Sequence, residues 1–491
     1  MYHKIRINIM QLQELVKNIQ YKGTPDNREI SSITYDSRKV KPGTLFVAIS
    51  GMQTDGHEFI PQAIENGAVA ILSNGRSPKT KAVPILQVKN PRLAMSQISA
   101  QFYGNPSAKI NIVGITGTNG KTSITHILHH ILQTSGAACG TLGTLGFQTP
   151  SGMVSTGFTT PESVELQQML QTLTLAGVDN LVMEISSHAL DLHRVDDVEV
   201  DIAVFSNLTP EHLDLHGDME KYFKSKLQLF QSLSNTNIAV VNLDDPYGER
   251  ICSATAAKII TFAINEKADL HPVHTEFTLH GIKAELKFEK KTISIDSLLI
   301  GEYNLSNIMA AVAAALSMEI SISKIESAII NMPSIPGRME HIPCDCPGKV
   351  FVDYAHSPDA YEKLFSNLVR LMDNQVKFIT VFGCGGNRDT GKRSEMAKIS
   401  EKYASFSFVT TDNPRTELLE RINADIIQGF PGGNYTVIPD RKEAITTALK
   451  QMDEKSILLV LGKGPENYQE IGSEKIPHSD IEIIKDYTNA G

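Results

Sequence analysis

One stretch of nine residues, Gly114-Ile-Thr-Gly-Thr-Asn-Gly-Lys-Thr122, constrains the fold of this chain more than any other. The apolar, β-branched run 110–113 precedes it and predicts a buried strand. Isoleucine and leucine then recur at helical spacing over 124–132, which predicts an amphipathic helix from about Thr122. A strand, a glycine-rich turn and a helix N-terminus together form a phosphate cradle, because backbone N–H groups and the positive end of the helix dipole face the anion.

This stretch therefore predicts a binding site for a nucleoside triphosphate. Lys121 adds a positive charge, and the Thr122 hydroxyl can reach a Mg²⁺ ion. Gly117 and Gly120 let the backbone approach the phosphates without a side chain in the way. The spacing departs from G-x-x-x-x-G-K-T because position 115 is Ile. The alternative is a tight strand–helix turn with a lysine on the surface.

The composition is ordinary for a soluble globular enzyme and argues against several other classes of protein. The chain has 491 residues, of which 41% are hydrophobic and 21% charged. A formal net charge of −9 argues against general affinity for nucleic acid or anionic membranes. The five cysteines form neither a disulfide framework nor a zinc spacing, so we expect reduced thiols and a cytoplasmic protein. We expect neither a signal peptide nor a membrane-spanning segment.

Strand-like runs that end in polar or glycine-bearing loops recur along the chain and predict an α/β fold of three domains. Such loops are typical of parallel sheets, whose ligands gather beyond the carboxyl ends of the strands. We expect a small N-terminal α/β domain at 1–105, a central ATPase of the phosphate-loop type with a parallel sheet at 106–336, and a Rossmann-like domain at 337–491. Pro336-Gly-Arg338 is a candidate hinge.

Two strand ends and one helix carry candidate metal-binding groups. Glu184 ends a predicted strand and His212 follows another, so both are candidate Mg²⁺ ligands beside Thr122. For either residue alone, a buried and hydrogen-bonded polar group is the alternative. Lys226 shares a helical face with Tyr222 and other apolar side chains. Its amine either reaches solvent or has lost its positive charge through modification.

Arg388 and Arg415 follow separate strands of the predicted third domain. Arginine presents a planar fork that matches a carboxylate in a bidentate manner. Two such side chains beyond strand ends predict capture of an acidic small molecule, although a solvent-facing arginine is the alternative for each.

Further motifs occur in a fixed order along nearly the whole chain, and together they resemble those of the Mur ligases. The resemblance is strongest to members that add the third amino acid of the bacterial cell-wall peptide. The motifs are Asp36-Ser-Arg38, Leu45-Phe-Val-Ala48, Gly117-Thr-Asn-Gly-Lys-Thr122, Thr159-Thr-Pro161, Glu184-Ile-Ser-Ser-His188, Ser206-Asn-Leu-Thr209, His212-Leu-Asp214, Gly301-Glu-Tyr-Asn304, Pro336-Gly-Arg-Met-Glu340, Asp353-Tyr-Ala-His356 and Asp412-Asn-Pro-Arg415.

The resemblance implies an ATP-dependent ligase that forms an amide bond through an acyl phosphate. It implies catalytic roles for Lys121, His212 and Lys226. It also implies that Mg²⁺ is held by Thr122, Glu184, His212 and Lys226 in its carbamate form. The implied ATP contacts are Gly117, Thr118, Asn119, Gly120, Lys121, Thr122, Asn304, Arg338, Asp353 and His356.

The acceptor implied by the resemblance is UDP-N-acetylmuramoyl-L-alanyl-D-glutamate, and the incoming amine is meso-diaminopimelate. The matching acceptor residues are Ser37, Met52, Gln53, Thr54, Thr159, Thr160, Ser186 and Arg194. The matching diaminopimelate residues are Arg388, Asp412, Asn413, Pro414, Arg415, Gly462 and Glu466. Arg415 would pair with the second carboxylate of diaminopimelate, which L-lysine lacks, and this favours diaminopimelate. L-Lysine is the alternative amine. Leu192 and Pro465 depart from the usual motifs of the family.

Two rival interpretations come from other proteins with such a core. Folylpolyglutamate synthases share the central ATPase but lack the Asp-Ser-Arg and Asp-Asn-Pro-Arg motifs. A nucleotide-binding scaffold without catalysis would not need Lys121, Glu184, His212 and Lys226 together. We therefore expect a monomeric enzyme whose partners are small molecules, with no nucleic acid bound. Ligand loops on three domains also predict that the domains close during the reaction.

Overall fold

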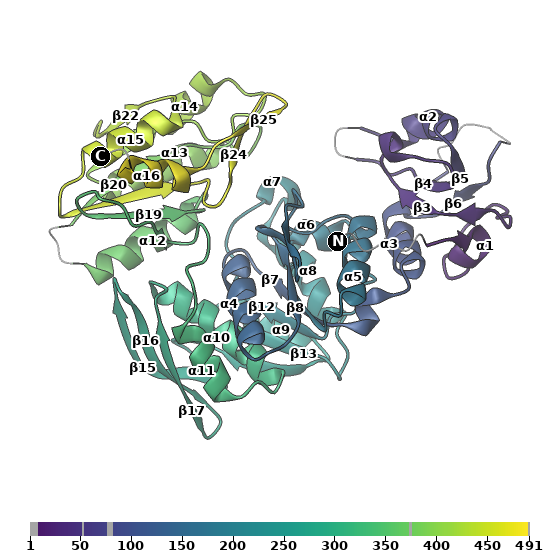
Figure 1. Cartoon of the computed structure of the whole chain (residues 1–491), viewed down its shortest axis with the longest axis horizontal. Coiled ribbons are helices and arrows are strands. Elements are labelled where there is room, and N and C mark those ends of the chain that lie inside the picture. Colours follow the sequence, from purple (N-terminus) through teal and green to yellow (C-terminus); the bar gives the residue numbers. More distant parts are fainter. Residues whose placement is uncertain (1–7, 52–53, 76–81, 373–375, 490–491) are drawn as a thin grey trace.

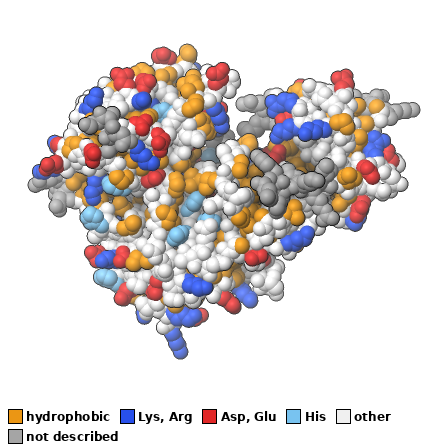
Figure 2. Space-filling model, in the orientation of Figure 1, with side chains coloured by type: hydrophobic (Ala, Val, Ile, Leu, Met, Phe, Trp, Pro, Cys, Tyr) orange, Lys and Arg blue, Asp and Glu red, His pale blue; other side chains and the backbone are white. Residues whose placement is uncertain are grey.

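The computed structural model describes residues 8–51, 54–75, 82–372 and 376–489. It has three α/β domains, as the sequence predicts, each built around its own sheet (Figure 1). Within the described residues, no helix is long and apolar enough to cross a membrane. On the face drawn in Figure 2, acidic and basic side chains are interspersed.

The N-terminal domain is organised on a four-stranded parallel sheet in the order β3-β4-β5-β6. Its strands β4 and β5 are buried, which agrees with their apolar sequences. Helix α2 ends at Glu65, shortly before Gly67, whose φ of +104° a helix cannot continue. The elements are β1 (Met10–Gln11), α1 (Leu12–Leu15), β2 (Glu29–Ile30), β3 (Ser32–Thr34), η1 (Ser37–Lys39), β4 (Thr44–Val47), η2 (Gly56–Phe59), α2 (Ile60–Glu65), β5 (Ala68–Ser73), β6 (Ile85–Gln87) and α3 (Pro91–Phe102).

The central domain has an eleven-stranded sheet in the order β10-β9-β8-β11-β7-β12-β13-β14-β15-β16-β17. Helices cover both faces of its middle, so that Val113 and Ile115 of β7 enter one core and Ile112 enters the other. The elements are η3 (Pro106–Lys109), β7 (Asn111–Thr116), α4 (Lys121–Thr134), β8 (Cys139–Gly143), β9 (Gly146–Thr149), β10 (Gly152–Val154), α5 (Ser163–Leu175), β11 (Asn180–Glu184), α6 (Ser187–Asp191), β12 (Ile202–Phe205), α7 (Leu213–His216), α8 (Met219–Gln231), β13 (Ile238–Asn242), α9 (Gly248–Ala254), β14 (Lys258–Phe262), β15 (Leu270–Thr278), β16 (Gly281–Phe288), β17 (Lys291–Ser297), α10 (Glu302–Ser317) and α11 (Ile322–Ile330).

The parallel sheet predicted for this domain is confirmed from β8 to β15, whereas both edges are antiparallel. Strands β15, β16 and β17 follow one another along the chain and pair as a meander. Short turns join them, and a strand that returns directly beside its predecessor must run antiparallel to it. The alternation of this region was not recognised in the sequence.

The C-terminal domain has a six-stranded sheet in the order β18-β19-β23-β20-β21-β22, parallel except at β18. In this domain the strand-like runs that end in polar or glycine-bearing loops are β19, β20, β21 and β23. The β24–β25 hairpin was not expected. The elements are β18 (Glu340–His341), β19 (Lys349–Asp353), α12 (Pro358–Leu371), β20 (Lys377–Phe382), α13 (Gly391–Tyr403), β21 (Phe406–Val409), α14 (Leu419–Ile427), β22 (Tyr435–Val437), α15 (Arg441–Lys450), β23 (Ser456–Leu461), β24 (Tyr468–Ile471), β25 (Glu474–Pro477) and α16 (Asp480–Asn489).

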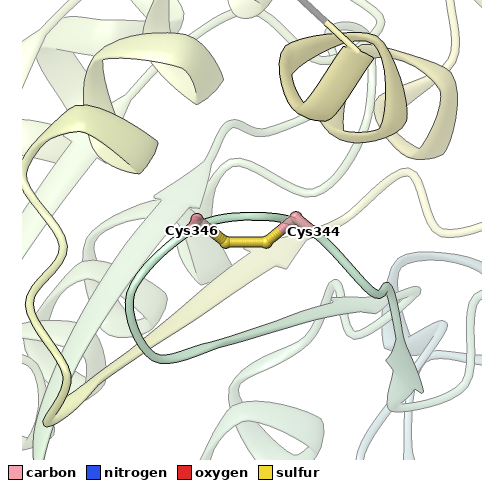
Figure 3. The surroundings of a disulfide bond; sticks show 2 residues. All are labelled: Cys344 and Cys346. Carbon is pink, nitrogen blue, oxygen red and sulfur yellow. A yellow bond between two sulfur atoms is a disulfide. The ribbon is translucent and has the colours of Figure 1, made fainter. Parts of the chain in front are cut away.

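One expectation about the cysteines is wrong. A disulfide joins Cys344 to Cys346 in the segment between β18 and β19 (Figure 3). The tight bend at Asp345 places their Cα atoms 5.3 Å apart, which is within the span of a disulfide. Cys139, Cys252 and Cys384 are free thiols, as expected.

Candidate active site

The phosphate loop connects β7 to α4, as the sequence predicts, and two of its glycines are required by the packing. Gly117 has a φ of +150°, and a Cβ atom there would lie 1.9 Å from the Ser206 hydroxyl. Gly120 has a φ of +88°, and its Cβ atom would lie 2.3 Å from Oδ1 of Asn307. Since neither position has room for a side chain, the backbone of the loop remains open to an anion.

Lys121 lies at the first turn of α4 and folds back over the loop. Its Nζ donates to the carbonyl oxygens of Gly117 at 2.9 Å and Thr118 at 2.8 Å. Burial lowers the pKa of Lys121, while the carboxylates of Glu211 and Glu184 act in the opposite direction. The Lys121 amine therefore lies over the loop, where a phosphate would bind.

Glu184 ends β11 directly beside this helix and is 1% exposed. Its Oε1 accepts from the Thr122 hydroxyl at 2.9 Å and from the Thr144 backbone N–H at 2.9 Å. The carboxylate fills the space beside Gly143, where a Cβ atom would lie 2.3 Å from Oε1. Thr122 and Glu184, two of the predicted Mg²⁺ ligands, thus lie side by side, and both supply hard oxygen atoms.

Lys226 of α8 is 1% exposed, so the alternative in which it reaches solvent is wrong. Its Nζ donates to the Gly117 carbonyl oxygen at 2.9 Å and lies 4.7 Å from the centre of the Tyr222 ring. Burial, and then the positive charge of Lys121, lower the pKa of Lys226 well below its usual value. This lysine lies beneath the phosphate loop as a buried amine.

His212 lies farther out than the other candidate metal ligands. Its side chain is 44% exposed, and its Nε2 lies 3.7 Å from Oε2 of Glu211. Its ring packs edge-on against His188, with 4.9 Å between the ring centres. In the described part of the chain, no group of three or more His, Cys, Asp or Glu side chains is arranged to hold a metal ion. His212 and Glu184 do, however, line the same pocket.

The C-terminal domain closes over the phosphate loop through three side chains. Arg338 donates from Nη2 to the Thr122 hydroxyl at 3.0 Å. Oδ2 of Asp359, in the first turn of α12, accepts from Nδ2 of Asn119 at 2.9 Å and from the Thr209 hydroxyl at 3.0 Å. Nε2 of His356 lies 3.7 Å from Oε1 of Glu211. These three contacts bring residues that are distant in the sequence together around the phosphate loop.

A pocket of about 380 Å³ lies at this junction and contains several predicted ATP contacts. Asn304 is 2% exposed and accepts from Nδ2 of Asn307 at 3.2 Å. Asp353 accepts from the backbone N–H groups of Met339 and Ala355, and burial raises its pKa. The lining residues among the predicted ATP contacts are Asn119, Gly120, Asn304, Arg338, Asp353 and His356.

Asn307 and Asp359 were missed by the sequence analysis. Asn304 and Asn307 are three residues apart and share one face of α10, and this spacing could have identified Asn307. Asp359 follows the Asp353-Tyr-Ala-His356 motif closely, but its partners lie in another domain.

A larger pocket of about 670 Å³ joins the phosphate loop to the carboxyl ends of the C-terminal strands. One wall holds Lys121, Thr122 and Glu184, and the other holds the predicted amino-acid residues. The latter are Arg388, Asp412, Asn413, Arg415, Gly462 and Glu466. Pro414 is not among the described residues that line it. Sequence positions almost 350 residues apart, such as 121 and 466, therefore share one pocket.

The loops that carry Arg388 and Arg415 are tied together beneath the pocket. Arg393 of α13 is fully buried and contacts both carboxylate oxygens of Glu417 at 2.8 Å. Glu417 also accepts from the backbone N–H of Asn387 at 2.8 Å. Hydrogen bonds from Arg393 and from that backbone N–H lower the pKa of Glu417 to about 2. Glu417 thus supports the loops as an anion and does not face the pocket.

Within the proposed acceptor set, the residues from the central domain are closely connected. The Thr160 hydroxyl donates to the Glu184 carbonyl oxygen at 2.9 Å, and Ser186 caps α6. Arg194 contacts Glu162 at 2.8 Å and donates to the Thr160 carbonyl oxygen at 3.0 Å. Thr159, Thr160, Ser186 and Arg194 all line the larger pocket.

The predicted acceptor residues of the N-terminal domain are not among the described residues that line the larger pocket. The Ser37 side chain is buried, and its hydroxyl donates to Oε1 of Gln62 at 3.1 Å. Thr54 is exposed. Met52 and Gln53 lie outside the described residues. These positions therefore stay predictions.

The fold and the loop define a nucleotide-binding protein whose larger pocket extends to the facing C-terminal domain. Comparison with known proteins identifies the family. Three family models match: "Mur ligase family, catalytic domain" at residues 29–103, "Mur ligase middle domain" at 115–315 and "Mur ligase, glutamate ligase domain" at 337–464. The chain belongs to the Mur ligase family, whose members are ATP-dependent enzymes that form amide bonds.

Similar proteins match over almost their full length. The UDP-N-acetylmuramoyl-L-alanyl-D-glutamate--2,6-diaminopimelate ligase of Syntrophomonas wolfei is 39% identical over 481 residues, which is 96% of this chain and 98% of that protein. A solved structure of a ligase of the same name is 30% identical, with a TM-score of 0.70 and coverage of 98% and 99%. A folylpolyglutamate synthase of Mycobacterium tuberculosis is 18% identical, with a TM-score of 0.64 and coverage of 75% and 92%, and shares the fold alone.

Proposed function

We propose that this enzyme adds meso-diaminopimelate to the D-glutamate of UDP-N-acetylmuramoyl-L-alanyl-D-glutamate, with cleavage of ATP to ADP and phosphate. The observation that carries this proposal is the larger pocket, which has a phosphate loop on one wall and Arg388 and Arg415 on the other. The names of the similar ligases support the same substrates.

The chemistry needs two steps at one place. An oxygen of the acceptor carboxylate attacks the γ-phosphorus, the bond to ADP breaks, and an acyl phosphate forms. The amine nitrogen then attacks the acyl carbon, loses a proton, and phosphate leaves. Lys121 and the loop N–H groups would orient the phosphates and balance their charge, because phosphoryl transfer depends on positioning and electrostatic stabilisation.

Magnesium fits the residues beside the loop. The Thr122 hydroxyl and the Glu184 carboxylate lie 2.9 Å apart at the N-terminus of α4, and both are the oxygen ligands that Mg²⁺ prefers. His212 lines the same pocket and completes the proposed ligand set with Lys226. When bound, the ion would neutralise charge on the phosphates.

Lys226 is proposed to act as a carbamate. Its neutral amine attacks CO₂, an N–C bond forms, and one proton is released, which leaves an anion in place of a cation. The lowered pKa of Lys226 favours the neutral amine that this reaction requires. An anion at this buried position would also be compatible with Lys121 and with a metal ion.

Selectivity for diaminopimelate is assigned to Arg415. Diaminopimelate has a second carboxylate that L-lysine lacks, and a lysine in the pocket would leave the guanidinium without that partner. Arg388 and Asn413 would bind the same ligand, and Glu466 would accept from its ammonium group. We assign UDP to the N-terminal domain through Ser37 and the 52–54 loop, with the domain boundaries at 105 and 336. We further propose a cytoplasmic monomer.

Phosphate release tests the proposal. The full chain is incubated with ATP, Mg²⁺ and the UDP-muramoyl-dipeptide, and meso-diaminopimelate is compared with L-lysine. Release with diaminopimelate and little with lysine is expected. A preference for lysine would overturn the role of Arg415, and no release with either amine would favour a nucleotide-binding scaffold.

A further inference from the structure

The loop that carries Arg415 is held in place by the β24–β25 hairpin. Nε2 of Gln469 donates to the carbonyl oxygens of Thr411 and Asp412, both at 3.2 Å. The backbone N–H of Glu470 donates to Oδ1 of Asn413 at 2.9 Å. Three consecutive residues that precede Pro414 are thus bonded to two residues of one strand.

The backbone of Arg415 is bonded on both sides to the hairpin, to β24 and to the residue that follows it. Its N–H donates to the Glu470 carbonyl oxygen at 2.9 Å, and its carbonyl oxygen accepts from the Gly472 N–H at 2.7 Å. These bonds hold Arg415 at a φ of +53°, a left-handed conformation that is unfavourable for a residue with a Cβ atom. The β24–β25 hairpin therefore fixes the backbone position from which the Arg415 side chain extends.

The side chain of Glu470 also contacts the guanidinium group of Arg415. Its Oε2 lies 2.9 Å from Nε of Arg415, and Nη1 of Arg415 donates to the Gly386 carbonyl oxygen at 2.9 Å. A planar group held at two separate edges cannot rotate freely. These contacts use Nε and Nη1 of Arg415. Among the described residues Nη2 has no further hydrogen-bond partner, so it is available to a carboxylate in the pocket.

We propose that Glu470 is a positioning residue for the selectivity of this enzyme, because it holds Arg415 with its free edge toward the second carboxylate of the incoming amino acid. The side chains are partly buried, with Arg415 at 23% and Glu470 at 32% exposure, so their contact is only partly screened by water. The inference rests on the proposed function and assigns a selectivity role to a residue outside the pocket lining.

Two roles of Glu470, competition with the substrate and positioning of Arg415, predict opposite changes in diaminopimelate binding when Glu470 is removed. If Glu470 merely occupied Arg415, its carboxylate would compete with the carboxylate of the substrate. Removal of Glu470 would then improve the binding of diaminopimelate. If Glu470 positions Arg415, its removal weakens binding, because a mobile guanidinium must be ordered when the ligand binds.

Steady-state kinetics of the full chain with ATP and the UDP-muramoyl-dipeptide distinguish the two effects. For Glu470→Ala, the KM for meso-diaminopimelate should rise about tenfold, as expected for loss of one charge-assisted contact, while the KM for ATP stays unchanged. Glu470→Gln should lie between, since it keeps an acceptor without the charge. The ratio of kcat/KM for diaminopimelate to that for L-lysine should fall in both variants. Glu474→Ala, on the exposed partner strand, is the matched control and should behave as wild type.

An unchanged or lower KM for diaminopimelate in the Glu470 variants would overturn the proposal. Thermal unfolding midpoints are measured in parallel, and Glu470→Gln decides the question if Glu470→Ala does not fold. A wild-type enzyme that does not use diaminopimelate would instead refute the proposed function, so the two failures are distinguishable.

Discussion

The Nζ atoms of Lys121 and Lys226 share one acceptor, the carbonyl oxygen of Gly117, at 2.9 Å each. One lysine comes from the helix that follows the phosphate loop, and the other from α8. Two ammonium groups on one carbonyl repel each other, and burial adds to the cost of charging Lys226. Conversion of Lys226 to an anion would turn this repulsion into attraction.

The first prediction concerns Lys226. We expect Lys226→Ala to lower phosphate release at least a hundredfold and bicarbonate not to restore it, because the variant has no amine to modify. Wild-type enzyme depleted of CO₂ should recover when bicarbonate is added. Lys224→Ala, an exposed lysine on the same helix, is the control and should remain active. An active Lys226→Ala enzyme would exclude the carbamate role.

The phosphate loop could be predicted from sequence because its signals are local. A β-branched strand, glycines at a turn and a helical apolar period lie within 25 consecutive positions, 110–134, and each depends on its neighbours alone. The separate strands of the C-terminal sheet could be predicted for the same reason. Glu184 and Asp353 each end a strand, β11 and β19, so the polar residues of their motifs stand out after an apolar run.

The residues that were missed act across the fold. Asp359 contacts Asn119, which lies 240 positions away, and no local pattern connects them. Glu470 faces Arg415 only because the β24–β25 hairpin docks on a loop from another strand. Only β15 is irregular, with a register shift between Pro272 and His274. The sequences of β16 and β17 alternate regularly between apolar and polar residues, so the signal for these two strands was present and was not used.

The second prediction concerns Asp359 as a contact between domains. Asp359→Ala removes the acceptor for both Asn119 and Thr209, so we expect the KM for ATP to rise about tenfold. Small-angle scattering with nucleotide and both substrates should show a larger radius of gyration than for wild type. Glu362→Ala on the same helix removes a carboxylate that contacts α13 within its own domain, and serves as the control. Equal ATP dependence in both variants would contradict the prediction.

The third prediction concerns pH and the histidines of α4. Burial, then His129 and then Arg338, lower the pKa of His126 to about 4. In the unfolded chain the pKa of the same imidazole is about 6.5. Between about pH 4 and pH 6.5 the unfolded state therefore binds more protons than the folded state. The contribution of the neutral His126 side chain to the free energy of unfolding is complete above about pH 6.5 and is lost as the pH falls toward about 4.

Denaturant unfolding at pH 7 and pH 5 tests this sign. The free energy of unfolding of wild type should fall between pH 7 and pH 5 by about 2 kcal/mol more than that of His126→Gln. His274→Gln, at an exposed position of β15, should keep the wild-type dependence. Parallel pH profiles for wild type and His126→Gln would show that His126 is not responsible.

The fourth prediction concerns a buried ion pair beneath the amino-acid site. Arg441 and Asp480 are both fully buried, and Nε and Nη2 of Arg441 donate to the two carboxylate oxygens at 2.8 and 2.7 Å. Nη2 also donates to the carbonyl oxygen of Leu461, which precedes Gly462 of the pocket. The pair therefore connects α15 and α16 to the end of β23.

Asp480→Asn leaves the guanidinium buried without its counter-charge, so we expect the free energy of unfolding to fall by about 3 to 5 kcal/mol. The double variant Arg441→Met with Asp480→Leu should lose less, because a pair of apolar side chains leaves no unpaired charge. Glu482→Gln, on the exposed face of α16, should change stability by no more than about 0.5 kcal/mol. Denaturant unfolding curves give all three values. If Asp480→Asn were as stable as Glu482→Gln, water or another group would have to satisfy Arg441, and the pair would not be what holds α16 against β23.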